Sequence, residues 1–395
     1  MTERREVWIT GVGLLTCLGE GLEKAWEHLE RGDPPPYDDK SFAPYIVHQL
    51  PQMNFDKQIP KKSDQRQMET WQRVGVYSAG LALSDAGIAG NADLLDHTDM
   101  IVAAGGGERD IAVDTAIMAG LRKTNQPGAF LNERLMSDLR PTLFLAQLPN
   151  LLAGNISLVH GIVGSSRTFM GEESAGVDAV RVAQARIAAG QSELTLVGGA
   201  YHGTRWDVLL AFELGGVVLK NKFAPVWDRG PEGGIAFATM GAFLMLESKE
   251  HAVARGARPR ARISQVFSDR NVRQEGDAEA SLRGQWDTIA ARVDRAHSAV
   301  ISGAAGLQPA TSAELTVLKE IGLPVRNTGT HIGHGVDTQF MANLGIGCAA
   351  IEHGKLFAPT GSGDIGASPE GLRQVVVTSI GNWRGEGLAL LERVN

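Results

Sequence analysis

Strand-like and helix-like segments alternate along the whole chain, and this alternation constrains the fold more than any single motif. In the first half we predict strands at residues 7–10, 100–104 and 193–197 and helices at residues 21–31, 70–86 and 175–189. In the second half we predict strands at residues 260–266, 298–301 and 374–379 and helices at residues 313–321 and 337–353. Such alternation is typical of the α/β class. The similar order of elements predicts two halves, which we place at residues 1–250 and 251–395.

Glycines mark many of the predicted boundaries. Gly11 and Gly13 follow the first strand and predict a turn there, while Gly198 and Gly199 are predicted to end the strand at 193–197. The Gly-Gly-Gly run at 105–107 has neither the Gly-x-Gly-x-x-Gly spacing nor a Walker lysine. We therefore predict a tight turn at this run and no nucleotide site.

The composition is that of a globular protein and argues against several classes. Hydrophobic residues make up 43% and charged residues 21% of the chain, and no run of about 18 uncharged apolar residues predicts a membrane span. The formal net charge of -7 argues against nucleic acid as a partner. Cys17 and Cys348, the two cysteines, support neither a disulfide framework nor a cysteine metal site. The charged first residues predict no secretion signal, so we expect a cytoplasmic protein.

Motifs in a fixed order along the chain resemble those of the β-ketoacyl-acyl-carrier-protein synthases. The crossover between the halves matches the family closely, with Glu250-His251-Ala252 followed by Arg255-Gly256-Ala257. The other similar segments are 9–13, 66–87, 150–164, 190–200, 225–234, 241–247 and 333–335. Any one segment is weak, but their common order favours the family. The resemblance implies a thiolase-like fold, with two pseudo-duplicated α/β halves in a layered α-β-α-β-α core.

The resemblance also implies catalytic groups from which this chain departs. The family holds its acyl chain as a thioester on a cysteine at the N-terminus of a buried helix, where the helix dipole favours thiolate. Counting back from Gly198, the cysteine position falls on Glu173. A carboxylate is a poor nucleophile and forms no thioester, so we expect a chain defective in condensation. The alternative is that Glu172 and Glu173 are ordinary acidic residues in the first turn of a helix.

Three further departures point the same way. The first family histidine falls near Ala304, and the family lysine falls on Gly329, whereas the second histidine is kept as His334. The family's glycine-rich C-terminal loop gates the pocket and supplies an oxyanion donor. In this chain the corresponding positions are Asn382, Trp383 and Arg384.

These departures lead to a hypothesis for the floor of the pocket. We expect Glu173 and His334 to face each other in a charge-assisted hydrogen bond, with Arg384 as the alternative partner of Glu173. His331 precedes His334 by three residues, a spacing that could suggest a metal. No third ligand is evident in the sequence, so we predict no metal.

Three functions remain open. The first is a partner subunit similar to a chain-length factor, which completes a dimer with a cysteine-containing ketosynthase and shapes the acyl tunnel in fatty acid or polyketide biosynthesis. Such subunits often carry glutamine at the cysteine position, so Glu173 departs from that pattern too. The second is an active 3-oxoacyl-synthase-type acyltransferase, or a malonyl-carrier decarboxylase in which glutamate mimics an acylated cysteine. The third is a self-sufficient homodimeric synthase with a different active site, or unrelated chemistry on this fold.

The expected partners also follow from the resemblance. We expect an acyl carrier protein whose phosphopantetheine arm delivers the substrate, no resident cofactor, and a homodimer or a heterodimer with a cysteine-containing ketosynthase. The interface candidate is 164–170, where Phe169 and Met170 either wall a shared tunnel or belong to the core. An acidic carrier requires cations at the tunnel mouth. The candidates for this docking role are Lys62, Arg66, Arg122 and Lys123.

Overall fold

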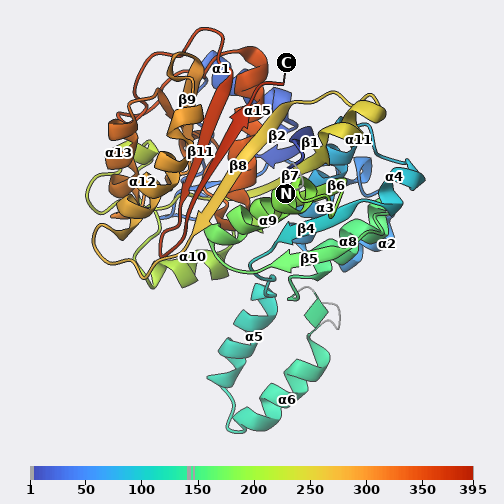
Figure 1. The fold of residues 1–395 in the computed structure, drawn as a ribbon. Helices are drawn as coiled ribbons and strands as arrows, with labels where there is room; N and C mark the ends of the chain where they lie inside the picture. The colour runs from blue at the N-terminus through green and yellow to red at the C-terminus, as the bar shows by residue number, and fades with distance from the viewer. Residues whose placement is uncertain (1–3, 140–143, 146, 395) are drawn as a thin grey trace.

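The computed structural model describes residues 4–139, 144, 145 and 147–394, and its main strands join in one mixed sheet (Figure 1). One half of the sheet runs in the order β1 (Val7–Thr16), β7 (Phe237–Ser248), β6 (Leu194–His202), β4 (Asp99–Ala103) and β5 (Ser166–Phe169). The other half runs in the order β8 (Ala261–Asp269), β12 (Glu386–Glu392), β11 (Gln374–Ile380), β9 (Ser298–Ser302) and β10 (Val325–Asn327). β1 and β8 pair antiparallel and so join the halves.

The two halves repeat one pattern of strand pairing. In each, the first two pairings are antiparallel and the next two are parallel. The predicted α/β class and the pseudo-duplication are therefore confirmed. The boundary that we placed at residue 250 falls in α11 (Lys249–Ala254), between β7 and β8, and stays a prediction.

The helices form three layers, and strands lie between them. The central layer packs α9 (Glu173–Ala188), α15 (Gln339–His353) and α1 (Leu22–Arg31) against strands of both halves. On one outer face, α3 (Thr70–Asp85) and α8 (Leu151–His160) cover the first half. On the opposite face, α12 (Asp277–Ile289) and α13 (Ala310–Ile321) cover the second half. This is the layered α-β-α-β-α order that the resemblance implied.

The glycines near the first strand allow close packing and do not form the predicted turn. β1 continues through Gly11 and Gly13 to Thr16. A Cβ atom on Gly13 would lie 1.9 Å from the carbonyl oxygen of Ser78 in α3, and one on Gly11 would lie 2.4 Å from that of Ala82. β6 likewise continues through Gly198 and Gly199. The predictions that the strands end at these glycines are wrong. The chain does not reverse there, and a Cβ atom is excluded because backbone or side-chain atoms of neighbouring elements lie too close.

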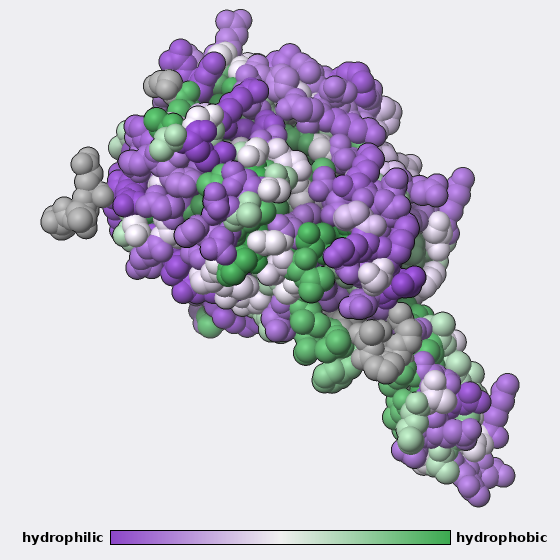
Figure 2. Space-filling model, turned by 90° about the vertical axis from the view of Figure 1, so that its right-hand side faces the viewer, coloured by the Kyte–Doolittle hydropathy of each residue, from purple (hydrophilic) through white to green (hydrophobic). Residues whose placement is uncertain are grey.

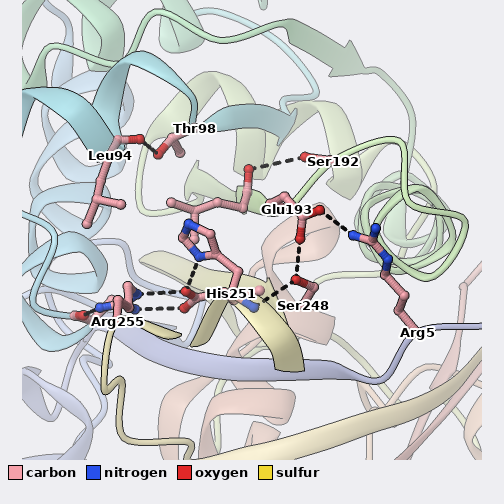
Figure 3. A network of polar contacts seen from close by, with 11 residues as sticks. Arg5, Leu94, Thr98, Ser192, Glu193, Ser248, His251 and Arg255 are labelled. Carbon is pink, nitrogen blue, oxygen red and sulfur yellow. Dashed lines mark hydrogen bonds and ion pairs between the residues drawn. The ribbon is translucent and has the colours of Figure 1, made fainter. Parts of the chain in front are cut away.

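The crossover motif is a buried ion-pair network that joins β7 to α11 (Figure 3). Arg255 donates to both carboxylate oxygens of Glu247 at 2.6 and 2.7 Å, and His251 lies 2.5 Å from the same carboxylate. Arg255 also donates to the carbonyl of Ala86 at the end of α3. Glu247 is fully buried, so this close match to the family reflects a structural requirement of the fold rather than its chemistry.

A helical arm projects from the body of the molecule (Figures 1 and 2). It contains α5 (Ile111–Leu121) and α6 (Pro127–Ser137), and the sequence analysis did not foresee it. Figure 2 shows hydrophobic atoms gathered where the arm leaves the body. The exposed large apolar side chains of the arm and its root include Met118, Met136, Phe144 and Leu145.

The remaining described elements are short or lie at the edges. They are β2 (Gly19–Glu20), β3 (Val47–His48), α2 (Lys62–Gln67), α4 (Ala92–Asp96), α10 (Trp206–Glu213) and α14 (Gly329–Ile332). Within the described chain, no helix is both long enough and apolar enough to cross a membrane.

Candidate functional site

Glu173 is the first residue of α9 and lies at the centre of the candidate site. Only 3% of the residue is exposed. Its Oε1 atom is 3.1 Å from Nε2 of His334, which is also buried. The two side chains are therefore within hydrogen-bonding distance. The predicted contact between Glu173 and His334 is therefore present, at a helix N-terminus where the dipole favours a negative charge.

The same oxygen of Glu173 has a second donor. The side-chain amide of Asn382, from the C-terminal loop, donates to Oε1, so this oxygen receives two hydrogen bonds. The other carboxylate oxygen, Oε2, is buried without a partner among the described residues. A carboxyl group that is bonded through one oxygen and enclosed at the other is held in place, and it is poorly suited to attack a substrate carbonyl.

Close backbone packing brings these groups together. α9 meets the 3-10 turn Val336–Thr338, which follows His334, at Gly176. A Cβ atom on Gly176 would lie 2.1 Å from the carbonyl oxygen of Asp337, so only glycine permits this approach. The approach places the segment that carries His334 against the first turn of α9.

Asp337 is a buried acid that the sequence analysis missed. It is fully buried, and the hydroxyl of Thr338 donates to its Oδ1 at 3.2 Å. Burial, with a smaller contribution from the Glu173 charge, raises the pKa of Asp337 to about 7. One sequence signal could have identified it. Asp337 is an acidic residue three positions after His334, at the start of a helix predicted to consist mainly of small residues.

The two positions that the sequence analysis matched to the family's histidine and lysine are adjacent. Ala304 and Gly329 are both buried, and a Cβ atom on Gly329 would lie 3.2 Å from the carbonyl oxygen of Ala304. Asn327 donates to that carbonyl at 2.9 Å, and Thr328 donates to Asn343 nearby. Neither position carries a titratable side chain, but a buried carboxyl group lies close by. Ser302, which accepts from the backbone N–H of Ala304, donates to Glu314 at 2.8 Å, and burial raises the pKa of Glu314.

Arg384 does not contact Glu173, so the alternative pairing proposed from the sequence is wrong. Its guanidinium pairs instead with Glu172 through two contacts, 3.0 Å from Nε to Oε2 and 3.2 Å from Nη2 to Oε1. This ion pair raises the pKa of Arg384. Trp383 lies between Asn382 and Arg384, is 43% exposed, and approaches Phe212 of α10 with ring centroids 5.6 Å apart.

A cavity of ≈ 250 Å³, here called the inner cavity, lies beside the start of α9. Its lining includes Gly107, Glu172, Tyr201, His202, Arg205 and Phe212. His202 lies 2.9 Å from the carboxylate of Glu108, which also accepts from the backbone of Trp71 at 2.6 Å. Although burial opposes it, this bonding and the Arg205 charge lower the pKa of Glu108. The tight turn predicted at residues 105–107 is wrong, because the chain makes no turn there and the three glycines form part of the cavity wall.

The cysteines and the remaining histidines offer no activated nucleophile or metal cluster. Burial raises the pKa of Cys17 to about 12 and also raises that of Cys348, and a thiol is reactive only as the thiolate. His331 bonds to the hydroxyl of Thr360 at 2.7 Å rather than pairing with His334. In the ranges that the structure describes, no group of three His, Cys, Asp or Glu side chains has the arrangement of a metal site.

The remaining predicted site residues are dispersed. Phe169, at the end of β5, packs against the central core, whereas Met170 is 66% exposed. The candidate docking cations lie in two places, with Lys62 and Arg66 in α2 and Arg122 and Lys123 after α5 in the arm (Figure 1). They form no single patch within one chain, and carrier docking stays a prediction.

The N-terminal domain of the beta-ketoacyl synthase family matches residues 4–252. This match covers more than half of the chain, which therefore belongs to the β-ketoacyl synthase family. A curated relative, the 3-oxoacyl-[acyl-carrier-protein] synthase 2 of Vibrio harveyi, is 24% identical over 265 residues, which are 65% of this chain and 60% of the relative. The chain thus aligns with less than two thirds of that relative's length.

Solved structures share the fold over nearly the whole chain. The ishigamide ketosynthase/chain length factor superimposes with a TM-score of 0.81 at 19% identity, covering 99% of this chain and 100% of that one. AntDE:AntF, a type II PKS acyl-carrier protein in complex with its ketosynthase bound to the hexaketide, gives a TM-score of 0.75 at 17% identity, covering 99% and 100%. These likenesses confirm the thiolase-like fold predicted from the sequence.

Proposed function

We propose that this chain is the non-condensing partner of a cysteine-containing ketosynthase in fatty acid or polyketide biosynthesis. The observation that carries the proposal is the state of Glu173, which is buried and held by His334 and Asn382 at the position of the family nucleophile. The absence of titratable side chains at Ala304 and Gly329 supports the same conclusion. In this role the chain carries no acyl group itself and shapes the tunnel in which its partner extends the acyl chain.

A two-subunit assembly is supported by the edge of the sheet. β5 pairs with β4 alone among the strands of the described chain, which leaves its other edge open. Exposed apolar side chains lie near this edge, namely Leu158, Val163 and Met170. An open strand edge with apolar neighbours favours pairing with another subunit. The substrate would arrive on the phosphopantetheine arm of an acyl carrier protein.

The test is a reconstitution with product detection. The purified chain is incubated with acyl-carrier and malonyl-carrier substrates, alone and together with a cysteine-containing ketosynthase from the same genome. The proposal predicts no β-ketoacyl product from the chain alone, and a higher yield or longer product from the pair than from the ketosynthase alone. Product from the chain alone would contradict it.

The retained contact between His334 and Glu173 favours one second candidate, a malonyl-carrier decarboxylase. In that reaction the malonyl thioester loses its carboxylate as carbon dioxide, and the carbanion takes up a proton to give the acetyl thioester. Carbon dioxide release by the chain alone, abolished by His334→Ala, would support this candidate. Its absence leaves the partner-subunit function as the better account.

A further inference from the structure

The inner cavity lies at the carboxyl ends of two parallel strands. β4 and β6 are neighbours in the sheet and run parallel, so the residues at their carboxyl ends meet at one edge. The glycine run at 105–107 follows β4, and His202 is the last residue of β6. Both belong to the lining of the cavity. In open α/β sheets this edge is the usual place for a ligand site.

His202 is held at this edge by a carboxylate. Its Nδ1 atom lies 2.9 Å from Oε1 of Glu108, and the two side chains are 17% and 9% exposed. The backbone N–H of Trp71, in α3, donates to the same oxygen at 2.6 Å. Although burial raises it, the bonds from His202 and Trp71 leave the pKa of Glu108 below its usual value. An ionised Glu108 only accepts hydrogen bonds, which assigns the proton of this contact to Nδ1 of His202.

The second ring nitrogen of His202 is free. Nε2 has no hydrogen-bond partner among the described residues, and it is not one of their enclosed polar atoms, so water reaches it. An imidazole with a carboxylate on Nδ1 and a free Nε2 has the arrangement of a general base. His334 differs, because its Nε2 contacts Glu173 and its Nδ1 is enclosed without a partner. The available base beside the cavity is therefore His202 and not His334.

Arg205 supplies a fixed positive charge on the same wall. Its Nη2 atom donates to the carbonyl of Gly107 at 2.8 Å, and its Nε atom lies 3.0 Å from Oδ1 of Asp207. The backbone N–H groups of Gly106 and Gly107 donate to no group in the described chain. Fixed cations and free N–H donors stabilise the oxyanion that forms when water attacks a carbonyl group.

The rest of the cavity wall is apolar and leaves room for a small group. Its residues are Trp71, Ala200, Val208, Phe212 and Val336. Val336 has a φ of 45°, in a left-handed region that β-branched residues rarely adopt, and such strain clusters at functional sites. The volume of ≈ 250 Å³ is below the range of about 300–1,000 Å³ for pockets that take drug-sized ligands. Apolar walls with a few polar groups suit a short acyl group whose carbonyl lies beside the polar ones.

We propose that this chain hydrolyses short acyl thioesters in the inner cavity, with His202 as the general base and Glu108 as the residue that positions it. Nε2 takes a proton from water while the water oxygen attacks the carbonyl carbon, and the carbonyl electron pair moves to the oxygen beside Arg205. When the carbonyl re-forms, the carbon–sulfur bond breaks, and the leaving thiolate takes the proton from Nε2. The products are a carboxylic acid and a thiol.

The two parts of this proposal have different foundations. The choice of a thioester rests on the proposed function, in which acyl groups reach the chain as thioesters. The base and its positioning carboxylate rest on the geometry of the cavity. No acyl group becomes attached to the chain, because water attacks the substrate directly.

The test is thiol release by the chain alone. Purified chain is incubated with S-butyryl-N-acetylcysteamine, a small thioester that needs no carrier protein, and the released thiol is measured with a chromogenic disulfide. We expect hydrolysis above the uncatalysed rate and a loss of about 10²- to 10⁴-fold in kcat for His202→Gln. His297→Gln is the matched control and should leave kcat unchanged, because His297 pairs with Asp294 outside the cavity.

Glu108 is tested by the separation of kcat from KM. We expect Glu108→Gln to lower kcat at least about tenfold with KM unchanged, because it removes the group that orients the base. No hydrolysis by the wild type, or an equal kcat in His202→Gln, would overturn the proposal. So would a fall in kcat that is matched by a fall in the urea midpoint, because the pair would then support only the fold.

The outcome is separate from that of the reconstitution. Thiol release that depends on His202, together with no effect on a ketosynthase, would contradict only the partner function. A higher or longer yield from the pair, together with no thiol release by this chain, would contradict only the hydrolysis.

Discussion

At the scale of single residues, Glu173 lies at a position that favours a negative charge but does not favour nucleophilic attack by its side chain. The N-terminus of α9 and the donors His334 and Asn382 stabilise the carboxylate. The same contacts hold one oxygen, and the other is enclosed. These contacts fix the shape of the site around the side chain of Glu173, as the proposed non-condensing role requires.

Two substitutions of Glu173 should separate hydrogen bonding from charge. Glu173→Ala leaves His334 and Asn382 without their acceptor, so we expect it to lower the free energy of unfolding by about 1–3 kcal/mol. Glu173→Gln keeps an acceptor oxygen, so we expect a smaller loss. Urea denaturation of both variants measures the difference. Equal losses would mean that the carboxylate charge, rather than the hydrogen bonds, supports the site.

Asp337 should make stability depend on pH between about 4 and 7. The pKa of the folded state is raised to about 7 from an ordinary value of 3.8, so the folded protein keeps a proton that the unfolded chain has released. The stabilisation is complete below pH 3.8 and is lost as the pH rises through 7. Full loss corresponds to about 4 kcal/mol at 1.36 kcal/mol for each pKa unit.

The measurement is urea denaturation across this pH range. Asp337→Asn should remove the fall in stability, because an amide does not titrate. The exposed Asp287→Asn is the control and should keep the wild-type slope. An unchanged slope in Asp337→Asn would show that another group is responsible.

The residue-level prediction from sequence was correct where motif order placed the groups. The contact between Glu173 and His334 follows from two motif positions that the fold brings together. The partner of Arg384 was wrong, and the roles of Asn382 and Asp337 were missed. These contacts depend on how the loop at 381–385 folds over α9, and no periodicity in the sequence reports the path of such a loop.

At the scale of elements, hydrophobic patterns located most strands and helices but not their lengths. β1 and β6 run through glycines that were predicted to end them. Those glycines are required by neighbouring elements far away in sequence, as Gly13 is by Ser78 in α3. The arm of α5 and α6 was not predicted, because its apolar residues do not face the core of this chain.

The junction of β7 and α11 should be sensitive to loss of one charge. Glu247→Gln leaves the half-buried Arg255 without its fully buried counter-ion, and we expect a loss of about 3 kcal/mol in the free energy of unfolding. Glu193→Gln is the matched control from the same network, where the carboxylate pairs with Arg5 at the surface (Figure 3). It should cost less than about 1 kcal/mol. Similar losses in the two variants would contradict the structural role of the crossover motif.

At the scale of the whole molecule, the chain has an unoccupied side. Among the described residues, β5 has no strand partner on its outer edge, and exposed apolar side chains lie around this edge and at the root of the arm. A monomer would expose this surface to water, whereas a second subunit of the same fold could pair with the strand and cover it.

A charge on this surface should therefore weaken assembly. We expect Met170→Asp to raise the dimer dissociation constant at least about tenfold, because burying an unpaired carboxylate in an apolar interface is costly. Val253→Asp, on exposed α11 away from β5, is the control and should leave assembly unchanged. Sedimentation velocity with and without the ketosynthase partner measures both. Equal dissociation constants for Met170→Asp and wild type would place the interface elsewhere.

The central claim is that this chain carries no acyl group while its partner does. The most direct test is intact-mass spectrometry of the two-chain complex after incubation with an unlabelled acyl-acyl-carrier protein. The account predicts one acyl adduct on the cysteine-containing chain and none on this one. An acyl adduct on this chain, mapped to any residue, would contradict the account.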